Sequence, residues 1–190
     1  CTGKYINQGG IAGRTESTGL GVYYCIRELL DTDSFLKKVG DPSKGIEGKT
    51  FAVQGLGNVG YWVSKFIVRD GGIITTVIER DAAIHKADGL DIEDVKKYIV
   101  ENKGSLAGYP GADEVETENP LKYLEREVQY IIPAAVEKSI HMGNAGNLKC
   151  QAVFEGANGP TTFAAEEILK EKGVVCVPDL LANGGGVTCS

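Results

Sequence analysis

Three glycines near the start of the chain have the spacing of a phosphate-binding turn. Gly55, Gly57 and Gly60 follow the apolar segment 51–54 and precede a segment with helical periodicity. In such a turn the first glycine permits the tight bend, the second lets the backbone approach a pyrophosphate, and the third lets the helix pack against the strand. The helix start would offer unpaired N–H groups and a positive dipole end to phosphate oxygens.

An acidic residue farther along the chain strengthens this interpretation. The chain holds 26 glycines, so the spacing alone would also fit an ordinary turn between a strand and a helix. However, segment 73–78 predicts a second strand, and Glu79 follows it about twenty residues after the last glycine, where a dinucleotide fold needs a carboxylate for ribose hydroxyls. Strand, turn, helix, strand and acid together predict a nucleotide site.

Short apolar segments alternate with helical ones along the rest of the chain. The strands expected are 51–54, 73–78, 128–132, 152–155 and 174–177. The helices expected are about 15–30, 61–68, 92–100 and 161–172. Strands without alternation of apolar and polar residues are typical of a parallel sheet covered on both faces. We therefore expect an α/β fold, a Rossmann-like doubly wound, mostly parallel sheet with helices on both faces.

The remaining segments are expected to be irregular. Segments 1–16, 31–48 and 102–120 predict loops, 80–89 predicts turns, and a turn into a short helix is expected after Pro133. Gly19 and Gly21 lie near the start of the first helix, where glycine lowers helix propensity. We therefore expect another part of the chain to approach closely there.

Unusual residues follow the carboxyl end of every expected strand. They occupy 55–60, 79–81, 133–135, 155–160 and 178–186. Open parallel sheets bind ligands along this edge. Asn58, Asn158 and Asn183 supply the donors and acceptors that a carboxamide such as that of nicotinamide would need. Asparagine and glycine also mark ordinary turns, but the whole set on one edge predicts a site.

Composition excludes several other classes of protein. With 190 residues, 42% of them hydrophobic, the chain is long enough for one sizeable domain, and a net charge of -6 argues against a general nucleic-acid binder. We find neither an apolar run long enough to span a bilayer nor a signal peptide, and neither end resembles a natural terminus, so we expect part of a longer chain.

The cysteines and histidines predict neither disulfides nor a metal site. Five cysteines, Cys1 among them, are scattered without a CxxC pair, which indicates free thiols in a reducing compartment. His85 and His141 lie too far apart to suggest metal ligands. A cytoplasmic location is expected, or the mitochondrial matrix if the source is eukaryotic.

Four blocks of sequence carry a family resemblance. They are Gly9-Gly10-Ile11-Ala12-Gly13-Arg14 with Ser17-Thr18-Gly19, then 53–60, 155–162, and 178–179 with 183–190. Together they make nearly the whole chain similar to the cofactor-binding domain of hexameric glutamate dehydrogenases, in the Glu/Leu/Phe/Val dehydrogenase family. The resemblance implies one NAD(P)-binding domain over 1–190, with 1–48 as a lead-in loop and helix and 49–190 as the sheet core.

The resemblance also implies an activity for the longer, two-domain enzyme. That activity is the NAD(P)-dependent oxidative deamination of L-glutamate to 2-oxoglutarate and ammonia, by an oxidoreductase that assembles as a homo-hexamer. The family carries its catalytic lysine and aspartate on a separate substrate domain, and neither motif occurs here. We therefore expect the chain to bind cofactor but not to turn over alone, with a small-molecule substrate as partner and neither nucleic acid nor membrane.

The resemblance carries roles over to single residues. The cofactor-binding residues it implies are Arg14, Thr18, Gly55, Gly57, Asn58, Val59, Gly60, Glu79, Arg80, Ala134, Ala135, Asn158 and Asn183. Val187 and Ser190 would reach the side chain of the substrate. Arg80 could pair with a 2′-phosphate, which favours NADP, whereas Glu79 would repel it, so the pair favours NAD or dual use.

Two alternatives stay open. The substrate could be leucine or phenylalanine, because the missing domain sets that choice. The chain could also be a non-catalytic nucleotide-sensing module, which predicts no lysine-bearing domain upstream in the longer protein.

Overall fold

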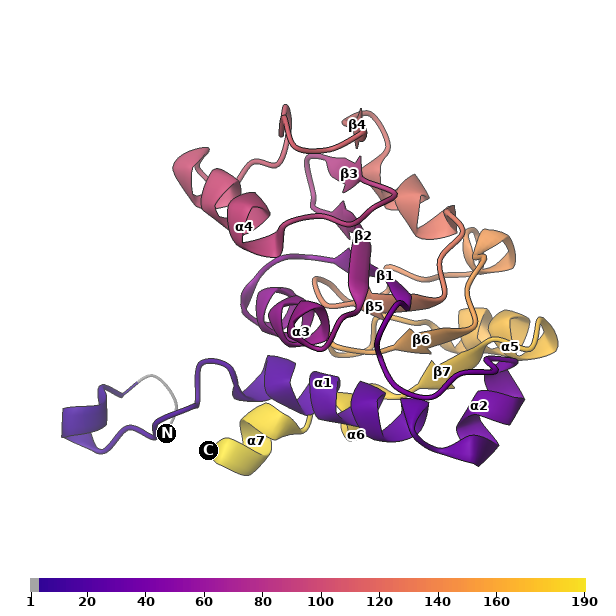
Figure 1. Ribbon diagram of the computed structural model, residues 1–190, viewed down its shortest axis with the longest axis horizontal. Helices are drawn as coiled ribbons and strands as arrows, with labels where there is room; N and C mark the ends of the chain where they lie inside the picture. Colours follow the sequence, from indigo (N-terminus) through magenta and orange to yellow (C-terminus); the bar gives the residue numbers. More distant parts are fainter. Residues whose placement is uncertain (1–3) are drawn as a thin grey trace.

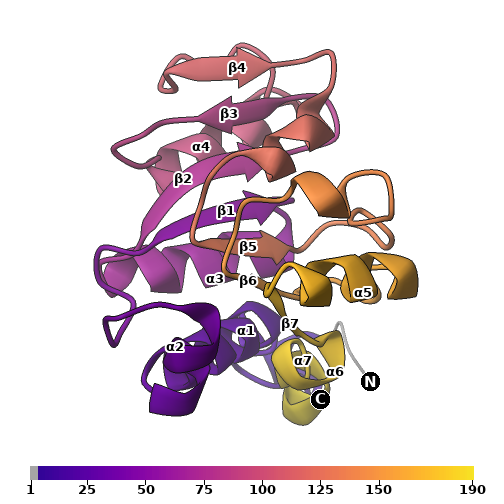
Figure 2. The same ribbon diagram turned by 90° about the vertical axis from the view of Figure 1, so that its right-hand side faces the viewer.

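One mixed sheet forms the centre of the computed structural model, which describes residues 4–190 (Figure 1). Its strands are β1 Thr50–Gln54, β2 Ile73–Ile78, β3 Ala83–His85, β4 Glu114–Glu116, β5 Tyr130–Pro133, β6 Ala152–Phe154 and β7 Val175–Val177. Their order is β4-β3-β2-β1-β5-β6-β7 (Figure 2). The strands β2, β1, β5, β6 and β7 run parallel, while β3 is antiparallel to both β2 and β4.

Helices cover both faces of this sheet. They are α1 Ser17–Leu30, α2 Asp33–Val39, α3 Asn58–Arg69, α4 Ile92–Glu101, α5 Phe163–Glu171, α6 Asp179–Ala182 and α7 Gly185–Cys189, with the short 3-10 helices η1 Ile6–Gln8, η2 Pro120–Glu125 and η3 Ala145–Asn147. Buried side chains of α1 to α4 pack on one face, and those of α5, η2 and η3 pack on the other (Figure 1).

Alternate residues of the central strands enter two different cores. Phe51 and Val53 of β1 join the cluster beneath α1 to α4, while Ala52 joins the cluster beneath α5. In β5, Tyr130 joins the cluster beneath α1 to α4 and Ile131 joins the cluster beneath α5. Because both faces are buried, the central strands are mostly apolar on both sides, which is why the sequence shows no alternation.

A buried ion pair holds the amino ends of β1 and β5 in place. Lys49 donates to the Oδ2 atom of Asp41 at 2.5 Å, and their side chains are 2% and 1% exposed. The Tyr130 hydroxyl donates to the same oxygen at 2.6 Å. Lys49 also donates to the carbonyl oxygen of Ser43 at 2.8 Å. These bonds satisfy the two buried charges and fix the connection from α2 to the sheet.

The fold class expected from the sequence is confirmed, and all five expected strands are present within the parallel part of the sheet. The expectation of close contact at Gly19 and Gly21 is also confirmed. A Cβ atom on Gly19 would lie 2.7 Å from the Cβ of Trp62, and one on Gly21 would lie 2.9 Å from the Cα of Gly185. Glycine therefore lets α1 approach α3 and α7.

The prediction of loops was wrong for several segments, which contain helices or strands. Segment 80–89 contains β3, and segment 102–120 contains β4, whose sequence Glu-Val-Glu is a charged edge strand with no apolar pattern. Segment 31–48 contains α2, and the glycine-rich end forms α6 and α7. The short helix expected after Pro133 is absent, since residues 134–144 contain no helix. These elements are short, and tertiary contacts form them despite weak local propensity.

Candidate functional site

The three positions of the turn before α3 differ in how far the structure requires glycine there. Gly55 has a φ of +84°, a conformation that favours glycine. A Cβ atom on Gly60 would overlap the carbonyl oxygen of Gly55. Gly57, the N-cap of α3, has a φ of −70°, and a Cβ atom there would meet no atom within 4 Å. The fold therefore requires Gly55 and Gly60, whereas Gly57 only leaves open space at the helix start.

Two charged side chains hold the peptide groups of Leu56 within this turn. Glu79, directly after β2, accepts a hydrogen bond from the Leu56 N–H at 2.5 Å through Oε1. Lys96 of α4 donates to the Leu56 carbonyl oxygen at 2.8 Å. The sequence analysis did not find Lys96, because only the packing of α4 beside the turn brings it there. An acid and a base therefore lie together at the ends of β1 and β2.

A cavity of about 330 Å³ adjoins this pair. Glu79, Arg80, Ala135 and Val136 are among the residues that line it, together with Gln54 at the end of β1. The Gln54 side chain belongs to a residue only 6% exposed, yet its Oε1 atom has no hydrogen-bond partner. This oxygen is closed to solvent in the structure, so it is an unsatisfied buried acceptor beneath the cavity and not an exposed contact for a ligand. Gln54 was also missed, since it reads as an ordinary strand residue.

Two alanines lie between the glycine turn and the loop after β6. A Cβ atom on Gly55 would lie 2.6 Å from the Cβ of Ala135. One on Gly156 would lie 3.2 Å from the Cβ of Ala134 and 3.3 Å from Cγ1 of Val59. The small residues therefore form a continuous surface along the middle of the sheet edge.

Two asparagines meet at the far end of this surface. Asn183, after α6, donates from Nδ2 to Oδ1 of Asn158 at 2.7 Å. The same amide group lies 3.4 Å from the Gly156 carbonyl oxygen and 3.3 Å from that of Ala157. The loops after β6 and β7 thus place both asparagines together, as the strand-end pattern predicted.

The expected substrate residue Ser190 meets the expected cofactor residue Arg14 where α1 begins and α7 ends. Arg14 donates from Nε to the Ser190 hydroxyl at 2.7 Å. A Cβ atom on Gly186 would contact the Thr18 hydroxyl, so Thr18 faces α7. Val187 is 82% exposed on α7. A cavity of about 270 Å³ includes Arg14 and Ser190 in its lining.

A hydrogen bond joins this region to the glycine turn. Asn58 donates from Nδ2 to the Thr15 carbonyl oxygen at 2.5 Å.

All of the expected residues lie along the carboxyl edge of the parallel strands or beside it on α1 and α7. They do not share one cavity, because Glu79 and Arg80 line one and Arg14 and Ser190 line another.

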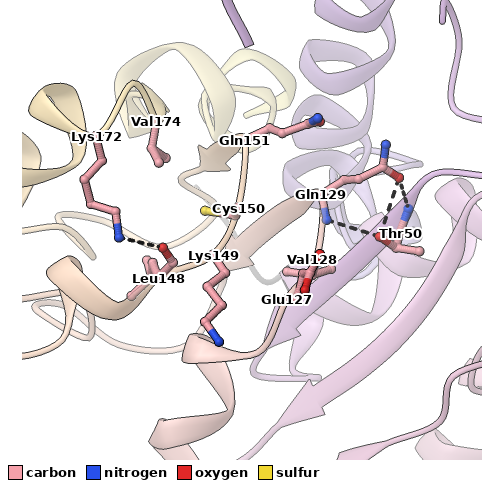
Figure 3. Close-up of a pocket in the computed structure, with 10 residues that line it drawn as sticks. All are labelled: Thr50, Glu127, Val128, Gln129, Leu148, Lys149, Cys150, Gln151, Lys172 and Val174. Carbon is pink, nitrogen blue, oxygen red and sulfur yellow. Dashed lines mark hydrogen bonds between the residues drawn. The ribbon is translucent and has the colours of Figure 1, made fainter. Parts of the chain in front are cut away.

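A larger cavity, of about 740 Å³, lies at the opposite edge of the sheet (Figure 3). It is lined by Thr50, Glu127, Val128, Gln129, Leu148, Lys149, Cys150, Gln151, Lys172 and Val174. None of the expected site residues is among them. Some polar groups there bond to one another: the Thr50 N–H donates to Gln129 at 2.9 Å, and Lys172 donates to the Leu148 carbonyl oxygen at 2.9 Å. The buried Oε1 atom of Gln151 has no hydrogen-bond partner.

The cysteines of residues 4–190 are all free thiols, and Cys1 lies outside the described residues. Burial raises the pKa of both Cys150 and Cys176 to about 12, which keeps them protonated and unreactive at neutral pH. Within the same residues no group of three histidine, cysteine or acidic side chains is placed to hold a metal ion. None of the helices described there is long and apolar enough to cross a membrane.

Comparison with known proteins identifies similar sequences. A family model described as Glutamate/Leucine/Phenylalanine/Valine dehydrogenase matches residues 9–190. The chain is 46% identical over 189 residues to the mitochondrial glutamate dehydrogenase of Dictyostelium discoideum, covering 100% of this chain and 37% of that protein. It is 41% identical over 190 residues to the glutamate dehydrogenase of Thermotoga maritima, covering 100% and 42%.

Solved structures give the same result. Plasmodium falciparum glutamate dehydrogenase matches with a TM-score of 0.80 at 26% identity, over 100% of this chain and 40% of that one. The hetero-hexameric glutamate dehydrogenase of Thermus thermophilus, in a Leu-bound form, matches with a TM-score of 0.80 at 32% identity, over 100% and 41%. The chain therefore spans about two fifths of the length of these relatives.

Proposed function

The chain belongs to the glutamate/leucine/phenylalanine/valine dehydrogenase family, and we propose that it is the nicotinamide-dinucleotide-binding domain of a glutamate dehydrogenase. The longer protein would catalyse the NAD(P)-dependent oxidative deamination of L-glutamate to 2-oxoglutarate and ammonia. The names of the similar proteins support glutamate over leucine or phenylalanine as the substrate. The domain would extend over 1–190, of which residues 1–3 lie outside the described part.

The observation that carries this proposal is the open space at Gly57. A helix start needs no glycine at its N-cap, and here a side chain would meet nothing in the protein. The first N–H groups of α3 have no partner within the helix. An open approach to these donors and to the positive end of the helix dipole suits a pyrophosphate. Glycine is one of several residues that suit an N-cap, so the fold favours it here but does not require it.

The residues on either side of Gly57 fit the two halves of a dinucleotide. The cavity beside Glu79 would take the adenosine half. The nicotinamide half would lie toward Asn158 and Asn183, with Thr18 near the carboxamide. When bound, the cofactor supplies the hydride chemistry. The residues of this chain would bind and orient it along the sheet edge.

The charges at the adenosine end support NAD or dual use of NAD and NADP. Glu79 is held by the Leu56 N–H, in a place to accept bonds from ribose hydroxyls and to repel a 2′-phosphate. Two cations offset that repulsion. Arg80 lines the same cavity, and Lys96 bonds to the adjacent glycine turn. The balance therefore favours NAD without excluding NADP.

The remaining parts of the proposal concern the longer protein. The catalytic lysine and aspartate would lie in the part of it outside this chain, and Val187 and Ser190 would reach the substrate from this side. We also propose a hexamer, because the T. thermophilus relative is described as hetero-hexameric. A cytoplasmic location, or the mitochondrial matrix in a eukaryote, stays a prediction.

Two measurements on the chain test the proposal. Calorimetric titration with NAD and with NADP should show one site for the dinucleotide, with NAD bound at least as tightly as NADP. Mixing the chain with glutamate and NAD should give no sustained rise in the absorbance of reduced nicotinamide. Failure to bind either dinucleotide, or sustained turnover, would contradict the proposal.

A further inference from the structure

Two carboxylates join the loops that carry Asn158 and Asn183. Glu155 follows β6 and is 8% exposed, and its Oε2 atom accepts from the Asp179 N–H at 3.0 Å. Asp179 begins α6, and its Oδ2 atom accepts from the Gly159 N–H at 2.8 Å. Each carboxylate therefore bonds to the backbone of the opposite loop. We call this reciprocal pair the loop brace.

We propose that Glu155 and Asp179 are positioning residues that hold Asn158 and Asn183 in place for the nicotinamide half of the cofactor. The inference rests on the proposed function. It assigns no contact with the cofactor to either carboxylate. Their effect passes through the two loops.

The brace acts on backbone directly beside each asparagine. Gly159, whose N–H is bound, is the next residue after Asn158. Asn183 is the C-cap of α6, and its N–H donates to the carbonyl oxygen of Asp179 at 2.8 Å. Fixing Asp179 therefore fixes both ends of α6 and, through Gly159, the Asn158 backbone. The bond between the two asparagine side chains depends on that alignment.

Neither loop has much order of its own. The helix α6 is only four residues long, too short to be stable without outside contacts. Gly159 has a φ of +54°, and a Cβ atom there would meet nothing within 4 Å, so packing does not confine it. Backbone bonds from Gly156 and Ala157 to the Pro133 carbonyl oxygen and the burial of Ala182 anchor the two loops to the core. The brace adds the bonds that lie nearest the two asparagines.

The brace also has a cost that a purely structural link would not need. Burial raises the pKa of Glu155, and the nearby charge of Asp179 raises it further. Hydrogen bonds from Thr161 and from the Asp179 N–H act the other way and lower that pKa, so burial is the main cause of its rise. Groups perturbed in this way cluster at functional sites. The geometry thus points to positioning as the reason for two acids here.

Separate titrations with NAD and ADP test the inference. ADP contains the adenosine and pyrophosphate parts but lacks the nicotinamide half, so it reports on the glycine turn and the cavity beside Glu79 and not on the two asparagine loops. In Asp179→Ala and Glu155→Ala, NAD should bind about tenfold more weakly, as expected for the loss of one or two hydrogen bonds, while ADP affinity changes less than about twofold. Glu155→Gln keeps an acceptor for the Asp179 N–H and should restore NAD binding.

Amide hydrogen exchange gives a second readout that does not depend on the ligand. In Asp179→Ala the Gly159 amide should lose protection, while amides of β5 keep theirs. As a control, Glu167→Ala changes an exposed residue of α5 and should leave both affinities as they are. Thermal melting checks that each variant is folded. If Asp179→Ala does not fold, the comparison between Glu155→Ala and Glu155→Gln decides.

The outcomes separate this inference from the proposed function. If the unchanged chain binds neither NAD nor ADP, the proposed function fails and the inference fails with it. If the unchanged chain binds both, but the alanine variants weaken NAD and ADP equally or weaken neither, only the inference is overturned. Weakening of NAD alone, reversed in Glu155→Gln, supports it.

Discussion

The two edges of the parallel sheet are made by the same five strands but contain different chemistry. At the carboxyl edge the strands lead into glycine turns and exposed amides, with open space at Gly57 and an unpaired oxygen on Gln54. At the amino edge many polar groups bond to one another, as in the Lys49–Asp41 ion pair and the Thr50–Gln129 bond, although the buried Oε1 atom of Gln151 has no partner there. The larger cavity nevertheless lies at the amino edge.

Under the proposed function, the larger of the two cavities is not the binding site, so cavity size alone would be a poor guide in this fold. A binding site needs donors and acceptors that the folded chain leaves unused. In parallel strands those occur beyond the carboxyl ends, where helix starts and loop amides point outward. The amino edge is therefore expected to govern stability, and the carboxyl edge to govern affinity for the cofactor.

Breaking the buried ion pair should give the largest effect. Lys49→Met leaves the Asp41 carboxylate buried without its cation, and we expect a loss of about 3–5 kcal/mol of unfolding free energy. Urea denaturation measures it. Lys65→Met, which removes an exposed pair with Glu93, should cost less than about 1 kcal/mol. Much weaker binding of NAD by the folded Lys49→Met chain would contradict the assignment of stability to the amino edge and of cofactor affinity to the carboxyl edge.

Acid should produce the next largest effect at the same edge. Burial acts to raise the pKa of Asp41, but hydrogen bonds from Lys49 and Tyr130 outweigh it and lower that pKa to about 2. Because the pKa is depressed from 3.8, the contribution to stability is complete above that value and is lost as the pH falls through about 2. The shift corresponds to about 2–3 kcal/mol.

Urea melts from about pH 5 down to about pH 2 measure this loss. Asp41→Asn removes the titrating group, so its stability should fall less steeply over the same range. Equal slopes for the two proteins would show that Asp41 is not the group responsible.

A smaller effect is expected at the adenosine end of the carboxyl edge. Glu79→Gln removes a negative charge but keeps an acceptor, so NADP should gain about five- to tenfold in affinity relative to NAD. Lys96→Met should lower the affinity for NADP and leave that for NAD nearly unchanged. Lys97→Met, on the neighbouring exposed residue, is the control. An unchanged ratio of the NAD and NADP dissociation constants in Glu79→Gln would rule out the role assigned to that carboxylate.

Much of the fold could be predicted from local sequence. The apolar segments, the glycine turn and Glu79 predict the parallel strands and their edge, because both faces of those strands are buried. The elements that escaped prediction depend on distant contacts. The strand β4 exists because β3 offers it an edge, and α7 forms from glycines because Gly185 packs against Gly21.

The candidate site was likewise predicted in part, in its position but not in all of its residues. Its position follows from the rule that ligands bind beyond the carboxyl ends of parallel strands. Lys96 and Gln54 were not found, since one reaches the turn from α4 and the other is distinguished only by an unpaired oxygen. Neither feature leaves a pattern in the nearby sequence. The loop brace likewise depends on two residues that are distant in the chain.

One pair of variants tests the central claim most directly. A Cβ atom meets no atom within 4 Å at either Gly57 or Gly146, and Gly146 lies beside Lys172 at the amino-edge cavity. Gly57→Ala should lower the melting temperature modestly, because alanine is a poorer N-cap than glycine, and Gly146→Ala should change it little. Calorimetric titration should show NAD binding about tenfold or more weaker in Gly57→Ala, because a methyl group would occupy the place of the pyrophosphate, and unchanged in Gly146→Ala. Unweakened NAD binding in Gly57→Ala, or weakening in Gly146→Ala instead, would contradict the account.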